Sequence, residues 1–443
     1  MLALSLVIQF VVMRITKDRI ANFTIFAFWL RYFVSSVPAI TFQPMIAGQS
    51  IMSIASMFVV AAGLTLYAMT YLSRRIFLPI YFYLIVVCLS GIVQGMYSGM
   101  AEHITKWFYI IVIVLGVALS VRRMNSDVFL KLLCTTFFLP LALQIVSIIF
   151  GVHKGTEEDL GNISYIGSYH HEAEFSVIVL AFIATISLIK DMKRSTRMWA
   201  FVIGMASIVF ANYRTATVAV IPLVLFYGTS GMFKYFPKRI NGKVLLLLGG
   251  IVVLVGIVAL TALSPRFSDL AQAFAKLPVV MSNPEYMNLA DRQLLSGRFV
   301  IWASYLYQYL QGNWFQLLFG YGPGSSAVYF TKYAHNAFVG ALFENGLVGL
   351  IAFSVVFYKL LRLSANAPGA IKIRAECLAV GLLLLSLATM PFENVEGLLY
   401  LGLVTGFGLG YSHFGELLGK KPIRRTEPET PLTAIPDTPQ ADS

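Results

Sequence analysis

The sequence predicts an all-α membrane protein, a polytopic bundle of about 12 to 13 transmembrane helices with one helical loop domain outside the cytoplasm. Three observations predict this fold. Of the 443 residues, 58% are hydrophobic and only 12% are charged, which is more apolar side chain than a soluble core of this size can bury. The apolar residues form runs about as long as a hydrocarbon core is thick. Lys and Arg gather in alternate gaps between the runs.

The apolar segments follow one another along the whole chain, and the first and eighth are short. The first shows no basic leader region or small-residue cleavage site, so we expect it to stay in the membrane. The segments are 2–15, 20–40, 50–72, 76–99, 104–121, 128–151, 172–189, 198–213, 215–233, 244–263, 335–361, 375–390 and 397–413.

The distribution of positive charge predicts the topology. Most of the 33 Lys and Arg residues lie in one set of alternate gaps, which the positive-inside rule places in the cytoplasm. The other set holds few, among them Lys154, Arg214 and Arg298, and Arg31 lies inside the second segment. We therefore expect a multi-pass protein of a bacterial inner membrane, with a cytoplasmic C-terminus and these three residues on the outer, periplasmic side.

Four parts are predicted from these patterns. Residues 1–263 form the N-terminal transmembrane helices and residues 335–413 the C-terminal ones. Residues 264–334 form an extracytoplasmic cap, because Phe299, Ile301, Trp302, Tyr305, Leu306 and Tyr309 recur at helical spacing. Residues 414–443 are rich in Pro, Thr and charge and form a disordered cytoplasmic tail.

Two arginines on the outer side are candidates for anion binding. Arg214 lies between two apolar segments with almost no loop, where a charge needs a partner, a wet cavity or a function. Arg298 begins the amphipathic helix of the cap, and a guanidinium at a helix N-terminus suits phosphate, whose oxygens its planar fork can bind in pairs. The alternatives are a snorkelling charge for Arg214 and a solvated helix face for Arg298.

His335 is a candidate general base at the outer entrance to segment 335–361. The dipole at a helix N-terminus disfavours imidazolium, so a neutral His is available near pH 7. A hydrogen-bonded anchor at the interface is the alternative. Glu344 follows nine residues later, on the opposite face of a continuous helix, and it could orient His335 only if the helix breaks between them.

A further polar group opens segment 172–189 on the outer side, where His170, His171 and Glu172 follow one another. Adjacent histidines point apart on a helix and no further ligand follows at standard spacing, so we predict no metal site here and assign the group to acceptor binding or orientation. The glycine-rich run 320–324 lacks the Lys and Ser/Thr of a P-loop, and it predicts a tight turn.

Three stretches in this order resemble the superfamily of O-antigen ligases and Wzy-type polysaccharide polymerases: 212–217, 296–302 followed by 320–324, and 335–350. The last reads HNAFVGALFENGLVGL, and an outer-face His-Asn followed by Glu-Asn-Gly is typical of that family. The run HHEAEF in the seventh segment departs from the Asn-Pro-Asn-like stretch of many relatives. This departure favours a polymerase of a secreted or capsular polysaccharide.

The resemblance implies a GT-C-like, metal-independent glycosyltransferase that takes a polyprenyl-diphosphate-linked oligosaccharide as donor and needs no cofactor and no nucleotide sugar. By analogy Arg214 and Arg298 would hold the diphosphate and stabilise its growing charge, and His335 would take the proton of the acceptor hydroxyl. The expected partners are the lipid-linked oligosaccharide, the growing polysaccharide, membrane lipids, a flippase and a chain-length co-polymerase, and no nucleic acid.

Other functions stay open at this point. A ligase that transfers glycan to lipid A core differs from a polymerase only in its acceptor. A polysaccharide transporter or flippase would also have about a dozen helices, but such folds usually show two similar halves and charges near the midplane. A scaffold without chemistry is the remaining alternative.

Overall fold

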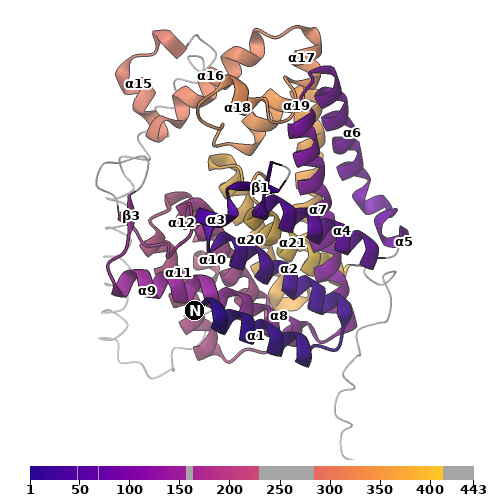
Figure 1. Ribbon diagram of the computed structural model, residues 1–443, viewed down its shortest axis with the longest axis vertical. Coiled ribbons are helices and arrows are strands. Elements are labelled where there is room, and N and C mark those ends of the chain that lie inside the picture. The colour runs from indigo at the N-terminus through magenta and orange to yellow at the C-terminus, as the bar shows by residue number, and fades with distance from the viewer. Residues whose placement is uncertain (47, 68, 156–162, 229–283, 413–443) are drawn as a thin grey trace, which may run out of the picture.

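The computed structural model describes residues 1–46, 48–67, 69–155, 163–228 and 284–412, and these are mostly helical, which confirms the all-α class (Figure 1). The predicted span 244–263, the start of the cap and the tail 414–443 lie outside the described residues. Within the described part, four helical stretches are long and apolar enough to cross a membrane: Arg75–Val93, Tyr97–Arg123, Ser126–Ile149 and Ala337–Ser364.

The first half of the chain alternates helices with short turns. Two small antiparallel hairpins interrupt it, one pairing β1 (Pro44–Ile46) with β2 (Gln49–Ser50) and one pairing β3 (Lys154–Gly155) with β4 (Ile163–Ser164). The helices are α1 (Leu2–Ile15), α2 (Arg19–Ser35), α3 (Pro38–Thr41), α4 (Ile51–Leu66), α5 (Met69–Leu72), η1 (Arg75–Phe77), α6 (Leu78–Val93), α7 (Tyr97–Arg123), α8 (Ser126–Cys134), η2 (Thr135–Phe137), α9 (Phe138–Ile149), α10 (Glu172–Leu188), α11 (Arg194–Ala211) and α12 (Arg214–Phe226).

The second half begins with the described part of the cap, which lies at one end of the molecule in Figure 1. Three long helices then return through the bundle. The elements are η5 (Pro284–Tyr286), α15 (Leu289–Gln293), η6 (Leu294–Gly297), α16 (Arg298–Leu310), α17 (Trp314–Phe319), α18 (Ser326–Tyr329), α19 (Ala337–Ser364), α20 (Gly369–Ala388) and α21 (Val395–Tyr411).

The centre of the bundle is the contact between α7 and α21. Every residue of α21 from Val395 to Gly410 is buried. Glycines on α21 let the two backbones approach closely, since a Cβ built on Gly402 would lie 2.5 Å from the side chain of Ile113 and one on Gly406 would lie 2.7 Å from the carbonyl oxygen of Val114. Small residues at a helix interface are the usual device for tight packing in a membrane.

Helix α7 is longer than the apolar pattern predicted. It begins at Tyr97, whereas the predicted apolar segment begins at 104, so Glu102 and His103 also belong to the helix. Figure 1 shows the upper ends of α6, α7 and α19 rising beside the cap helices.

The cap packs onto this upper end through aromatic side chains. The predicted helix is present as α16, where buried Phe299 and Ala303 pack within the cap and buried Tyr305 and Tyr309 pack toward α19. Tyr305 also contacts Phe343 of α19, with ring centroids 5.2 Å apart. The cap is thus tied directly to the bundle.

A break in α19 seats the glycine-rich turn. Gly346 has φ 68° inside the helix, and the carbonyls that the break exposes accept hydrogen bonds from the turn: Tyr321 N–H donates to Phe343 at 3.0 Å and Gly322 N–H to Glu344 at 2.9 Å. Gly320 has φ 81°, and a Cβ there would lie 2.3 Å from the backbone of Glu344. The run 320–324 forms the predicted turn, and its glycines permit this close approach.

Candidate functional site

His335 and Arg298 come together where the cap joins the bundle. Trp302 Nε1 donates to the carbonyl of Ala334 at 2.9 Å, which fixes the first turns of α16 against the backbone that leads into His335. The pKa of His335 is lowered to about 4; burial is the largest cause, and the electrostatic influence of Arg298, Lys332 and His171 acts in the same direction. The imidazole is therefore neutral at pH 7.

The backbone presents His335 in an unusual conformation. Its φ is 49°, in the left-handed region, which costs a residue other than glycine about 1 to 3 kcal/mol. The next residue, Asn336, caps α19 by accepting from Phe338 N–H at 2.9 Å, and it donates to Leu387 at 3.0 Å. His335 Nδ1 is buried and has no hydrogen-bond partner among the described residues. Packing and capping thus hold a neutral, unpartnered imidazole in place.

Arg298 is the first residue of α16 and follows Gly297, which has φ 79°. The helix has no side-chain cap at this end, so its first backbone N–H groups lack the capping acceptor that a side chain would supply. Arg298 Nε is buried and has no hydrogen-bond partner within the described part of the chain. This is an arrangement suited to an anion.

Two tyrosines complete the group. Burial raises the pKa of Tyr213 and of Tyr333; hydrogen bonding to Thr389 and the charge of Arg298 oppose the rise, and Glu172 adds to it. Tyr333 also lies against His335, with ring centroids 3.9 Å apart. The start of α10, the α11–α12 turn, the start of α16, the approach to α19 and the end of α20 therefore converge here.

Arg214 is the residue after Tyr213 and begins α12, with an exposed side chain. The chain reverses between α11 and α12 almost without a loop, because Asn212 ends α11 in a left-handed conformation with φ 52°. The side-chain amide of Asn212 donates to the carbonyl of Ile163 at 3.4 Å. The backbone of Arg214 thus lies beside the tyrosine of the group.

The two adjacent histidines diverge, as their spacing predicted. His171 caps α10 by accepting from Ala173 N–H at Nδ1, 3.0 Å away, and the same nitrogen lies 3.7 Å from Glu172 Oε2. His170 instead stacks on Phe42, with ring centroids 4.9 Å apart. His171 acts electrostatically on His335, and Glu172 acts on the two tyrosines.

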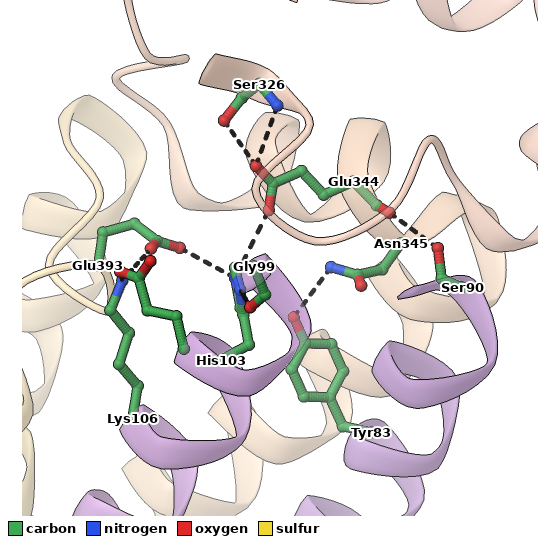
Figure 2. Close-up of polar contacts among 10 residues, drawn as sticks. Tyr83, Ser90, Gly99, His103, Lys106, Ser326, Glu344, Asn345 and Glu393 are labelled. Carbon is green, nitrogen blue, oxygen red and sulfur yellow. Dashed lines mark hydrogen bonds and ion pairs between the residues drawn. The ribbon is translucent and has the colours of Figure 1, made fainter. Parts of the chain in front are cut away.

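Glu344 belongs to a second cluster, shown in Figure 2. Its carboxylate accepts from Ser326 Oγ at 2.6 Å and lies 3.5 Å from His103 Nε2, and Glu393 lies 3.4 Å from the same nitrogen. Lys106 Nζ is 2.6 Å from Glu393. The break in α19 lies at Gly346, after Glu344, and therefore not between His335 and Glu344. The Glu344 carboxylate thus belongs to the second cluster and does not orient His335.

The second cluster also has the donors of a metal site, since ligand atoms of His103, Glu344 and Glu393 lie within 4.8 Å of one another. Each carboxylate already has another partner, Ser326 for one and Lys106 for the other. Burial raises the pKa of Glu393, but Lys106 and His103 outweigh this and hold the pKa well below its usual range. The set is arranged as an ion-pair network joining α7, α19 and the α20–α21 turn.

A third polar contact is buried between α2 and α21. Arg31 donates twice to Glu396, through Nε at 2.8 Å and Nη2 at 3.0 Å, and Ser35 Oγ donates to the same carboxylate at 2.7 Å. The Glu396 side chain has no exposed surface. A planar, two-bond pair of this kind is the strong form of the arginine–carboxylate interaction.

The sequence interpretation missed His103, Glu393 and Glu396, and it left Arg31 without a role. The available signal was charge inside or at the end of an apolar segment, where a partner is required. Glu393 and Glu396 flank the last segment and Arg31 interrupts the second, but partners so far apart in sequence cannot be matched without the fold.

Compared with known proteins, the chain matches no family model and no curated protein. The function is therefore argued from the geometry of the site and its chemistry.

Proposed function

We propose that the protein is a polysaccharide polymerase that joins polyprenyl-diphosphate-linked oligosaccharide repeats on the outer face of a bacterial inner membrane. The observation that supports this most is the neutral, unpartnered imidazole of His335 beside the guanidinium of Arg298. One group suits a base and the other an anionic leaving group, and glycosyl transfer from a lipid diphosphate requires both.

In the proposed reaction an acceptor hydroxyl attacks the anomeric carbon of the donor. His335 takes the hydroxyl proton, the bond from the anomeric carbon to the diphosphate oxygen breaks, and the diphosphate leaves with the bonding electrons. Arg298 and Arg214 stabilise the charge that grows on the leaving group. Binding of that anion also offsets the positive charge near His335, so the imidazole becomes a stronger base once the donor is in place.

The proposed polytopic bundle fits this chemistry. The site lies at the end of the bundle where the cap is attached, and the charge alternation predicts that this end faces the periplasm. Lipid-linked repeats have their diphosphate at the membrane surface, so a cap over that surface would enclose the reacting sugars. No nucleotide sugar or cofactor enters the proposed scheme.

The test uses purified protein reconstituted with polyprenyl-diphosphate-linked repeats extracted from the producing cells. The wild type should extend the glycan, and His335→Ala and Arg214→Ala should abolish extension at unchanged protein level. His153→Ala and Arg75→Ala, which replace exposed residues elsewhere, are the matched controls and should extend normally. Transfer of the glycan to lipid A core without extension would identify a ligase. Glycan extension by His335→Ala as long as that by the wild type would refute the proposal.

A further inference from the structure

A cavity of about 560 Å³ lies between α2, α4, α7, the start of α10 and the turn before α21. Its size is within the range of about 300 to 1,000 Å³ typical of small-molecule sites. Hydroxyl and amide side chains supply much of its wall: Ser50, Ser53, Ser56, Ser98, Thr105 and Asn394.

The charges in its wall exclude the diphosphate as its occupant. Arg31 and Lys106 line the cavity, but each is already paired with a carboxylate, Arg31 with Glu396 and Lys106 with Glu393. Lys106 also pairs with Glu102, so both basic groups in the wall already have a carboxylate partner. The wall therefore offers a doubly charged anion no uncompensated positive charge.

Glu174 carries an unused acceptor. Its Oε2 is buried and has no hydrogen-bond partner among the described residues, although the carboxylate lines the cavity. A buried polar atom of this kind needs a partner, and a ligand with O–H donors would provide one. Phe42 adds an aromatic side chain to the same wall. Hydroxyls, amides, a free carboxylate oxygen and an aromatic ring are what a sugar requires for binding.

The cavity and the group around His335 share the first turn of α10. His171 and Glu172 act on His335 and Tyr333, and Glu174, two residues later and about 200° around the helix, lines the cavity. The other lining residues lie at element ends that the charge alternation predicts to be periplasmic: the end of α2 and the starts of α4, α7 and α21.

We infer that this cavity binds uncharged sugar residues of the glycan substrate and holds them on the far side of α10 from the diphosphate. This inference rests on the proposed function and names a separate glycan site for it. Sugar hydroxyls would bond the serines, Asn394 and Glu174, and the paired charges of Arg31 and Lys106 would shape the site without attracting the diphosphate.

The test measures binding of the free oligosaccharide that mild acid releases from the lipid-linked repeats. The Ser56 hydroxyl donates to its own helix, to Met52 at 2.9 Å, so Ser56→Trp fills the cavity without removing a bond between helices. It should raise the dissociation constant at least tenfold. Ala61→Trp, at an exposed position on the same helix, is the matched control and should bind as the wild type does.

Glu174→Gln keeps the size of the side chain and replaces one carboxylate oxygen with an NH2 donor, and it should weaken binding about threefold or more. It also tests the proposal if Ser56→Trp does not fold. The free oligosaccharide carries no diphosphate and undergoes no transfer, so its binding is independent of polymerase activity. Undetectable binding to the wild type, or equal binding to all variants, would overturn the cavity proposal. Normal glycan extension by the wild type in the same preparation would still support the proposed function.

Discussion

Arg31→Met should destabilise the fold by about 3 to 5 kcal/mol, because it leaves the carboxylate of Glu396 buried without its counter-charge. The structure sets this magnitude. Glu396 has no exposed side-chain surface, and it accepts two hydrogen bonds from the guanidinium, at 2.8 and 3.0 Å, and one from Ser35 at 2.7 Å. Met preserves the apolar stem and removes both charged donors, so the loss is electrostatic.

The double variant Arg31→Met/Glu396→Gln should recover most of that loss. The Gln amide oxygen can still accept from Ser35, and no uncompensated charge remains. The double variant should be at least about 2 kcal/mol more stable than Arg31→Met. The control is Lys372→Met, which breaks a surface pair with Glu376 at 3.9 Å whose side chains are 54% and 43% exposed, and it should cost less than about 1 kcal/mol.

The assay is reversible unfolding of the purified protein in mixed micelles with increasing denaturing detergent, followed by circular dichroism. The four proteins are compared at one pH and one ionic strength. If Arg31→Met were no more destabilising than Lys372→Met, or if the double variant were as unstable as Arg31→Met, the buried pair would not have the energetic role argued here.

Two further predictions concern the proposed base and the glycine-rich turn. The pKa of His335 is lowered from 6.5 to about 4, so kcat/KM should fall only as the pH drops through about 4. In Arg298→Ala the pH of this fall should be higher, yet still below 6.5, because burial is the larger cause of the lowered pKa. A fall at the same pH in the pH–rate profiles of both proteins would contradict this. Gly320→Ala should cost about 2 to 4 kcal/mol of stability, since it adds a backbone clash to a positive φ. Gly95→Ala, where φ is 70° and the space is open, should cost only about 1 to 2 kcal/mol. Equal losses in the unfolding assay would contradict the close approach at Gly320.

Much of the helical framework followed from hydropathy alone. Segment 2–15 coincides with α1, and segments 172–189 and 397–413 differ from α10 and α21 by one to two residues at their ends. These helices are apolar along most of their length, so the hydropathy pattern alone marks them. The start of α7 was missed for the opposite reason: it is polar, and His103 can be buried there only because Glu344 and Glu393 on other elements lie against it.

The group around His335 was predictable in type but not in composition. A His before an apolar helix and an Arg at the start of a cap helix have chemical reasons to be there, and the structure brings His335 and Arg298 together. Tyr213, Tyr333 and Thr389 join them from three separate elements. Tyrosine and threonine carry no sign of a site in a sequence rich in interfacial aromatics, so that part of the group required the fold.

The measurement that tests the central claim most directly is the stoichiometry of the purified, reconstituted protein acting on radiolabelled lipid-linked repeats. Glycosidic bonds formed and polyprenyl diphosphate released are counted in the same reaction. The proposed mechanism predicts one lipid diphosphate released for each bond formed, with both products lost together in His335→Ala. Glycan extension without diphosphate release, or diphosphate release without extension, would contradict it.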